Sequence, residues 1–334
     1  MSDLNRRELL AGTALAGAAA ATGAVADRAA AQEGAGDPDL SGRSILVTGT
    51  SSGFGHLGAL HYARLGARVI ATMRDMPRPE ADALRQAAEA DGLDLHLVPL
   101  DVLDESSVRE GIAEGERIAG GALDVLVNNA GIGISGPVEL QDEVAAAQIF
   151  GTNVDGYLRT ARAALPAMRA AGRGLIVNSS SQLGRVIYPN IGLYSATKFA
   201  VEGLSEQMAY ELAPHGVDVA IVQPGGYPTE IWENGDRYTR ALLDRIGEER
   251  KAGYPELIDN ALRSSGGGST DPMDVPRAIA ELIAMPAGER PLRRPVHPGT
   301  KPQLRINEVS RRTQLAMLEN SPFGPAAKSV LGPA

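Results

Sequence analysis

Short apolar runs alternate with helical stretches along most of the chain, and this alternation constrains the fold most strongly. Runs rich in Val, Ile and Leu occur at 44–49, 68–74, 95–102, 123–131, 174–181 and 217–225, and the segment at 292–299 is a possible last strand. Helical stretches separate them at 55–66, 79–92, 104–120, 144–172, 194–216 and 272–285. Parallel strands covered by helices on both faces read as near-continuous apolar runs. The pattern therefore predicts an α/β fold, a single doubly wound parallel sheet of about seven strands flanked by helices.

Composition excludes several classes of function. The 334 residues are 43% hydrophobic and 22% charged, which is typical of a soluble globular protein. A net charge of −9 and 4% aromatic residues argue against a nucleic-acid partner. The chain has no cysteine, and its five histidines form no pair with metal-ligand spacing. We therefore expect no metal site.

The N-terminus resembles an export signal. Arg6 and Arg7 form a twin arginine, and an Ala/Gly/Leu run from about residue 9 to residue 26 follows. Small residues then precede Gln32, so residues 1–32 resemble a twin-arginine (Tat) signal, with a linker at 33–41. We expect an exported or periplasmic protein with no membrane span after signal removal. The alternative is a cytoplasmic protein with an Ala-rich tail or a weak membrane anchor.

A glycine-rich loop joins the first apolar run to the first helix. It reads TGTSSGFG, with glycines at Gly49, Gly53 and Gly55. Glycines allow a sharp turn and a close approach of the backbone to a pyrophosphate, which then faces the N–H groups of the helix N-terminus. The loop's place between a strand and a helix indicates a dinucleotide site that includes Ser51, Ser52 and Phe54.

Tyr194 and Lys198 are four positions apart in a predicted helix, so their side chains share a face. Lysine is rare here, with four against 28 arginines, which suggests that position 198 needs an ammonium group. A nearby ammonium favours the phenolate, so we expect it to lower the tyrosine pKa toward neutral pH. Tyr194 could then exchange a proton with a hydroxyl or carbonyl oxygen.

Six motifs in order resemble the short-chain dehydrogenase/reductase (SDR) family. They are TGTSSGFG (48–55), NNAG (128–131), NVDG (153–156), IVNSSS (176–181), YSATK (194–198) and QPGGYPT (223–229). The resemblance covers about residues 41–300. It implies an SDR Rossmann domain at 42–300 and leaves 301–334 as a C-terminal extension.

The resemblance implies a catalytic set of Asn153, Ser181, Tyr194 and Lys198. Tyr194 would be the general acid and base, and Ser181 would orient the reacting oxygen, with Ser179 and Ser180 as neighbours one or two positions away. Lys198 would also hold the nicotinamide ribose, and Asn153 would hold a water for proton relay. The reaction implied is hydride transfer between a nicotinamide cofactor and a carbonyl or alcohol carbon, and it needs no metal.

Cofactor choice depends on the end of the second strand. Members that prefer NAD usually carry an acidic residue there, whereas this chain has Met73 followed by Arg74, and Asp75 comes late. Arg74 can pair with a 2′-phosphate, so NADP(H) is favoured and NAD(H) is the alternative. The resemblance adds further cofactor residues, namely Asp101, Val102, Asn128, Ala130, Gly131, Pro224, Gly225 and Thr229.

The substrate would be bound by variable loops at 182–190 and 227–268. Tyr188, Trp232 and Tyr238 are candidate lining residues, or equally lid or subunit contacts. Members of the family commonly form homodimers or homotetramers through two long helices, here 144–172 and 194–216. A different class of function, a non-catalytic nucleotide-binding sensor or scaffold, would typically lack the tyrosine or the lysine, and this chain has both.

Overall fold

The computed structural model describes residues 37–263 and 266–332. The predicted export signal at 1–32 and the linker up to residue 36 lie outside the described residues. By its contacts the chain divides into 1–38 and 39–334, and everything below concerns the second unit. Within the described ranges, no helix is long and apolar enough to cross a membrane.

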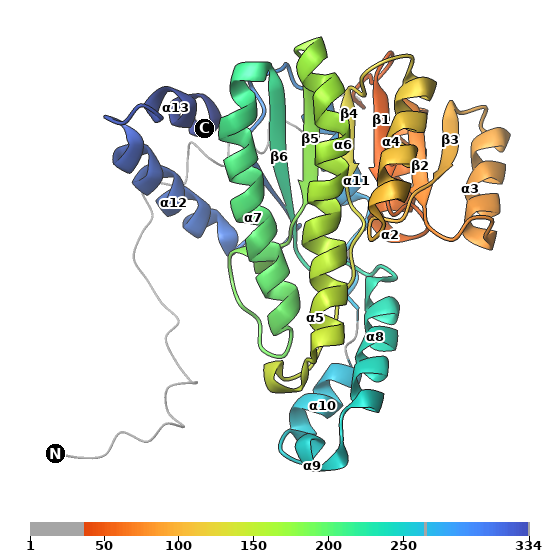
Figure 1. The fold of residues 1–334 in the computed structure, drawn as a ribbon, viewed down its shortest axis with the longest axis vertical. Coiled ribbons are helices and arrows are strands. Elements are labelled where there is room, and N and C mark those ends of the chain that lie inside the picture. Colours follow the sequence, from red (N-terminus) through yellow and green to blue (C-terminus); the bar gives the residue numbers. More distant parts are fainter. Residues whose placement is uncertain (1–36, 264–265, 333–334) are drawn as a thin grey trace. The chain divides into compact units, whose positions relative to one another are not determined.

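The second unit contains one seven-stranded sheet with the order β3-β2-β1-β4-β5-β6-β7 (Figure 1). All neighbouring strands pair in parallel, which confirms the predicted doubly wound sheet. The strands are β1 (Ser44–Thr48), β2 (Arg68–Met73), β3 (Leu95–Pro99), β4 (Val125–Asn128), β5 (Gly174–Ser179), β6 (Val217–Pro224) and β7 (Arg293–Val296).

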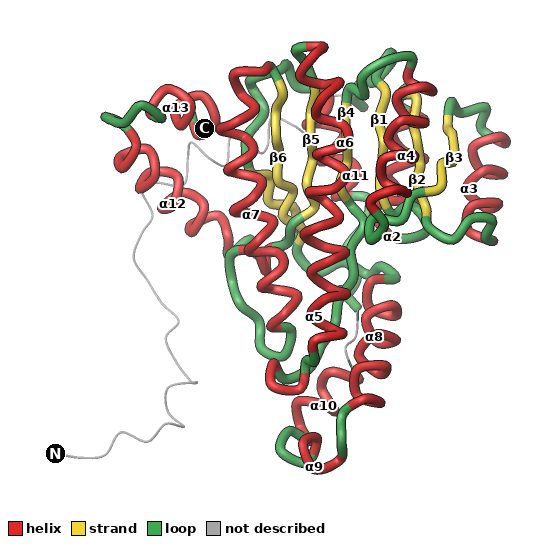
Figure 2. Tube along the Cα trace, in the orientation of Figure 1, coloured by secondary structure: helices red, strands yellow, loops and turns green. Residues whose placement is uncertain are grey.

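Helices cover both faces of this sheet, as Figure 2 shows. One layer contains α2 (Gly53–Arg64), α3 (Pro79–Ala90) and α11 (Asp274–Ala284), whose apolar residues share one core cluster. The other contains α4 (Glu105–Ala119), α6 (Gly156–Ala171) and α7 (Gly192–Leu212). In β5, Leu175 and Val177 enter the first core and Ile176 the second. Side chains alternate between faces along a strand, so a run apolar throughout fits a sheet buried on both sides.

The predicted long helix at 144–172 is interrupted. It consists of α5 (Glu143–Phe150), a π-helical turn at Gly151–Asp155 and α6. Both ends of the turn are tightly packed, since a Cβ at Gly151 would lie 3.0 Å from Leu103 and one at Gly156 would lie 3.0 Å from Val102. Such π turns are frequent at functional sites. The sequence predicted 144–172 as one helix, although the two glycines of GTNVDG (151–156) mark the place of the turn.

The predicted substrate region at 227–268 is mainly helical. It contains α8 (Ile231–Arg245), α9 (Glu248–Lys251) and α10 (Pro255–Leu262). Leu242 of α8 and Ile246, directly after it, pack with Ile134, Leu140 and Ile149 in a separate apolar cluster. The C-terminal extension forms α12 (Gln303–Leu318) and α13 (Gly324–Leu331). Short turns lie at Val138–Leu140 (η2), Gln182–Gly184 (η4) and Ala213–His215 (η5).

Candidate active site

The predicted site residues follow the carboxyl ends of β1, β4, β5 and β6, which meet at one edge of the sheet. The strand order reverses between β1 and β4, where doubly wound sheets commonly bind their ligands. Three segments come together there: the glycine-rich loop, the loop after β4 and the start of α7. A Cβ at Gly131, after β4, would lie 3.4 Å from Asn153 Oδ1 and 3.9 Å from Lys198 Nζ.

The glycine-rich loop is held against the loop after β4. Gly49 has a φ of +71°, and a Cβ there would lie 2.8 Å from Ala130 Cα. A Cβ at Gly55 would lie 2.3 Å from the Gly49 carbonyl oxygen. The Thr48 hydroxyl accepts hydrogen bonds from the Asn129 and Ala130 N–H groups, both at 3.0 Å. The residues present therefore form the kind of narrow backbone cradle that a pyrophosphate needs.

Asn129 and Thr48 are structural members of this cradle that the sequence reasoning missed. The Asn129 side chain donates to the Thr48 and Gly49 carbonyl oxygens at 3.0 and 3.2 Å. Asn129 stands inside the NNAG motif, next to the predicted Asn128, so its position was a usable signal.

Glu230 lies at the N-terminus of α2. The Gly53 N–H donates to Glu230 Oε2 at 2.9 Å, and the neighbouring Thr229 lies beside Gly53. A helix N-terminus has free N–H groups and a positive dipole end, so it favours anions. The carboxylate thus stands in for an anionic group at the predicted phosphate site. Nothing in the sequence pattern indicated a role for Glu230.

Arg74 lies just beyond β2 and is partly exposed. Its guanidinium donates to the Tyr238 hydroxyl of α8 at 3.2 Å, and its Nε lies 3.5 Å from Asp75. The Tyr238 hydrogen bond, together with the charges of Asp101 and Asp75, raises the Arg74 pKa, so the side chain is a permanent cation. Asp101 thus lies in the same neighbourhood as Arg74.

The other predicted cofactor residues lie either below the edge of the sheet, as Asn128 does, or at the edge and in its loops. Asn128 is fully buried, donates to Asn178 at 2.9 Å and accepts from Thr160 at 2.6 Å, so its side chain braces the sheet below the edge. Phe54 lies nearer the loops and meets the Tyr227 ring edge-on at 5.6 Å. The remainder form the edge itself, namely Ser51 and Ser52 in the glycine-rich loop, Val102 after β3, Pro224 at the end of β6 and Gly225 directly after it.

Tyr194 and Lys198 share one face of α7, as their spacing predicted. Lys198 is buried, and its Nζ lies 5.5 Å from the centre of the Tyr194 ring and 5.7 Å from that of Tyr157. The ammonium donates to the Ser179 carbonyl oxygen at 2.8 Å. Tyr157 donates to the same oxygen at 3.2 Å and is a neighbour that the motifs did not indicate.

The pKa of Tyr194 is raised, whereas the sequence predicted that Lys198 would lower it. Burial raises it to about 12, and a hydrogen bond with the Ser181 hydroxyl opposes that rise. Desolvation penalises the phenolate, and the Lys198 ammonium is directed at a carbonyl oxygen instead of the phenol. Burial also lowers the pKa of Lys198 to about 8, while the charge of Glu202 opposes that fall. At neutral pH the pair is a neutral phenol beside an ammonium ion.

Ser181 and Asn153 complete the predicted set. Ser181 begins η4, where its hydroxyl accepts from the Leu183 N–H at 3.1 Å, and it is the serine of the 179–181 run that bonds Tyr194. Asn153 lies in the π turn. Its side chain donates to the Ile132 carbonyl oxygen at 2.9 Å and accepts from the Ile132 N–H at 2.8 Å. Because those groups are engaged, the side chain joins the turn to the loop after β4.

Comparison with known proteins gives a consistent result. A family model described as short chain dehydrogenase matches residues 43–238. The 3-ketodihydrosphingosine reductase of Bacteroides thetaiotaomicron is 36% identical over 233 residues, which cover 65% of this chain and 81% of that protein.

Two solved structures share the fold. A short chain dehydrogenase/reductase from Burkholderia phymatum in complex with NAD is 26% identical, with a TM-score of 0.67, covering 85% of this chain and 97% of that one. A metagenomic short-chain oxidoreductase in complex with NADP is 27% identical, with a TM-score of 0.61, covering 78% and 99%.

Proposed function

This chain belongs to the short-chain dehydrogenase/reductase family, and we propose that it transfers hydride between NADP(H) and the carbonyl or alcohol group of a small molecule, with Tyr194 as general acid and base. Members of this family are NAD(P)-dependent oxidoreductases that act on alcohol and carbonyl groups, and this chain is one of them. The proposed roles rest on one observation, the meeting of Tyr194, Lys198 and Ser181 at the edge where a nicotinamide would enter.

Each residue of the catalytic set has its own role in the proposed hydride transfer. The bound nicotinamide supplies the hydride chemistry. Tyr194, a phenol whose pKa is raised to about 12, holds the proton that a reduced carbonyl oxygen must receive. Ser181 donates to the same oxygen and fixes its position. Lys198 provides a positive charge beside the phenol and favours any negative charge that develops on it. Asn153 acts by fixing the loop after β4 beside Lys198, because its side chain is already hydrogen-bonded to Ile132 and Thr197.

Arg74 supports the preference for NADP(H). It is a permanent cation at the end of β2, where an adenosine ribose would lie, and a guanidinium binds a phosphate in bidentate fashion. The related structures were solved with either nucleotide, so the preference rests on this residue.

We further propose that the substrate carries an apolar body. Val138 in η2 and Ile187 and Tyr188 in the segment between η4 and α7 are each about two thirds exposed. Gly136 pairs with Ile191, and Val138 packs close to Gly192, so these loops border the helix that carries Tyr194. Exposed apolar side chains that gather at a reaction centre favour an apolar ligand. Ile187→Ser should lower kcat/KM several-fold for long-chain or ring ketones and leave small polar ketones within about twofold.

Export and assembly stay predictions. The Tat-like segment would direct the protein to the periplasm, and fractionation of cells that express the full chain would test this. A homodimer or homotetramer would form through α5–α6 and α7, which light scattering would test.

The decisive test is fluorescence titration of the full chain with NADPH and NADH, followed by a panel of carbonyl substrates. Tyr194→Phe should lower kcat by about a thousandfold and leave the NADPH affinity within about twofold, because general acid catalysis contributes roughly 10²–10⁴-fold. Tyr62→Phe, which removes a hydroxyl from a buried tyrosine in the core beneath α2, is the control and should retain activity. NADPH binding without any turnover, unchanged by Tyr194→Phe, would favour the sensor instead.

A further inference from the structure

Two glutamates continue the Lys198 face of α7. Glu202 and Glu206 follow Lys198 at intervals of four residues, so the three side chains lie one above another. Glu202 is 2% exposed and Glu206 is 7% exposed. Carboxylates are seldom buried so fully unless they are paired, because desolvation of a charge is costly.

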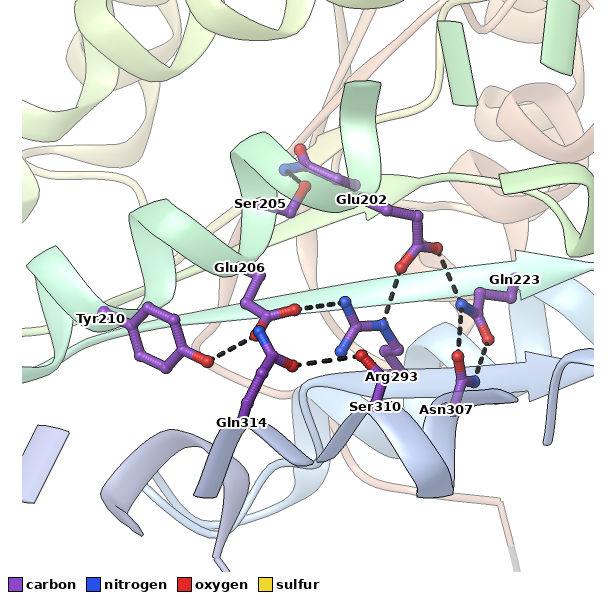
Figure 3. A network of polar contacts seen from close by, with 10 residues as sticks. Glu202, Ser205, Glu206, Tyr210, Gln223, Arg293, Asn307, Ser310 and Gln314 are labelled. Atoms are coloured by element: carbon purple, nitrogen blue, oxygen red, sulfur yellow. Dashed lines mark hydrogen bonds and ion pairs between the residues drawn. The ribbon is translucent and has the colours of Figure 1, made fainter. Parts of the chain in front are cut away.

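One arginine joins the two carboxylates. Arg293 of β7 donates from Nε to Glu202 at 2.7 Å and from a terminal nitrogen to Glu206 at 2.6 Å (Figure 3). Its side chain is 8% exposed. Glu202 also accepts from Gln223 of β6 at 2.8 Å. Both oxygens of Glu202 therefore have donors, and the carboxylate is fixed in place.

The C-terminal extension encloses this network. Asn307 of α12 donates to Gln223 at 2.7 Å, and Gln314 of α12 donates to Glu206 at 2.5 Å. Tyr210 of α7 donates to Glu206 at 2.5 Å. Two pairs of neighbouring elements, α7 with β6 and β7 with α12, thus contribute to one buried polar cluster (Figure 3).

Two cations act on Glu202. Arg293 is hydrogen-bonded to it, and Lys198, one helical turn before it, interacts with its charge. Arg185, after η4, also faces the cluster, and burial and the charge of Arg293 lower its pKa. Around Lys198 itself lie the neutral rings of Tyr194 and Tyr157 and the Ser179 carbonyl oxygen. The carboxylate whose charge acts on the ammonium is that of Glu202.

We propose that Glu202 is a positioning residue of the reaction centre: its buried carboxylate, fixed by Arg293 and Gln223, keeps Lys198 as an ammonium ion beside Tyr194. The proposal rests on the proposed function, in which Lys198 acts on Tyr194. Its chemical basis is that a desolvated lysine tends to release its proton, and a fixed anion nearby opposes this. The direction of the Lys198 pKa agrees, since burial lowers it to about 8 against the influence of Glu202.

The test is the pH profile of kcat/KM for NADPH-dependent reduction. Reduction needs the proton of the Tyr194–Lys198 pair, so the rate falls at high pH where the pair loses it. Glu202→Gln should move this falling limb to lower pH by about one unit, the lower end of the effect of a close opposite charge. At pH 8 the variant should lose kcat and retain its KM for NADPH.

Glu206→Gln is the matched control. It removes a buried carboxylate from the same helix face and from the same arginine, but one turn further from Lys198. Both variants should lower the melting temperature, and only Glu202→Gln should shift the limb. In each glutamine variant, Arg293 keeps the other glutamate as a carboxylate partner. Glu202→Asp retains the charge, and its limb should stay within about 0.3 pH unit of wild type.

The outcomes distinguish failure of the role of Glu202 from failure of the proposed function. A limb that shifts equally in both glutamine variants, or in neither, overturns the role of Glu202. Should Glu202→Gln not fold, a full unit of displacement in Glu202→Asp would overturn it as well. If instead wild-type turnover survives Tyr194→Phe or Lys198→Met, the proposed function fails and not merely this inference.

Discussion

At the scale of single residues, Arg74 should decide between the two nucleotides. We expect Arg74→Gln to weaken NADPH binding about tenfold or more and to change NADH binding less than twofold, because a charge-assisted bidentate contact with phosphate is lost. Arg78→Gln is the control, since Arg78 is a nearby arginine already paired with Glu80 at 2.9 Å. Fluorescence titration measures both affinities. An equal loss for the two nucleotides in Arg74→Gln would remove the basis for assigning NADP(H).

Glu230 should compete with the cofactor for the N-terminus of α2. Its carboxylate accepts from the Gly53 N–H, which a pyrophosphate would also use. Glu230→Gln should therefore tighten NADPH binding about two- to fivefold, the range of exposed charge interactions at a helix end. Glu233→Gln, at an exposed position in the first turn of α8, should leave the affinity unchanged. Weaker binding in Glu230→Gln would mean that this side chain holds the cofactor.

At the scale of elements, the C-terminal helices should be part of the folded core. Leu331 of α13 is 4% exposed and packs with the cluster below α6 and α7. Leu331→Ala should lower the free energy of unfolding by about 2–3 kcal/mol, as for large-to-small changes in a core. Leu304→Ala on α12 removes an equal volume from a side chain that is 51% exposed and should cost under about 0.5 kcal/mol. Urea denaturation compares them.

The strands and the motif residues could be predicted, because their signals are local. Apolar runs predicted six strands, the more polar segment at 292–299 indicated a possible last strand, and the four-residue spacing of Tyr194 and Lys198 predicted their common face. The π turn was not predicted, because the residues on either side of it are helical and only the two glycines of GTNVDG mark its place. The substrate region at 227–268 was predicted as loops and contains three helices, whose apolar face packs against η2 and α5. The pairing of Glu202 with Arg293 joins residues 91 positions apart and leaves no local pattern.

At the scale of the whole molecule, the buried lysine should make stability depend on pH. The pKa of Lys198 is lowered from 10.5 to about 8. Below pH 8 both the folded and the unfolded chain hold its proton. Between pH 8 and 10.5 the unfolded chain holds it and the folded chain releases it, so the free energy of unfolding rises with pH. Relative to Lys198→Met, the wild type should gain about 3 kcal/mol over this range.

Urea denaturation of both proteins at pH 7.5, 9 and 10.5 would measure this difference. Because both chains carry the same remaining groups, other titrations largely cancel between them. A stability difference that stays constant across the range would show that Lys198 titrates in the folded protein as it does in water.

The segment that begins α8 touches two parts of the predicted dinucleotide site, the glycine-rich loop and the adenosine end. Glu230, the residue before α8, contacts the glycine-rich loop, and Tyr238 within α8 contacts Arg74. A nucleotide that takes these partners must release both contacts together. The chain's one tryptophan, Trp232, lies in the first turn of the same helix and donates to the Tyr227 carbonyl oxygen at 2.8 Å. The protein therefore carries a built-in optical reporter, whose emission should change when the site fills, with no label attached.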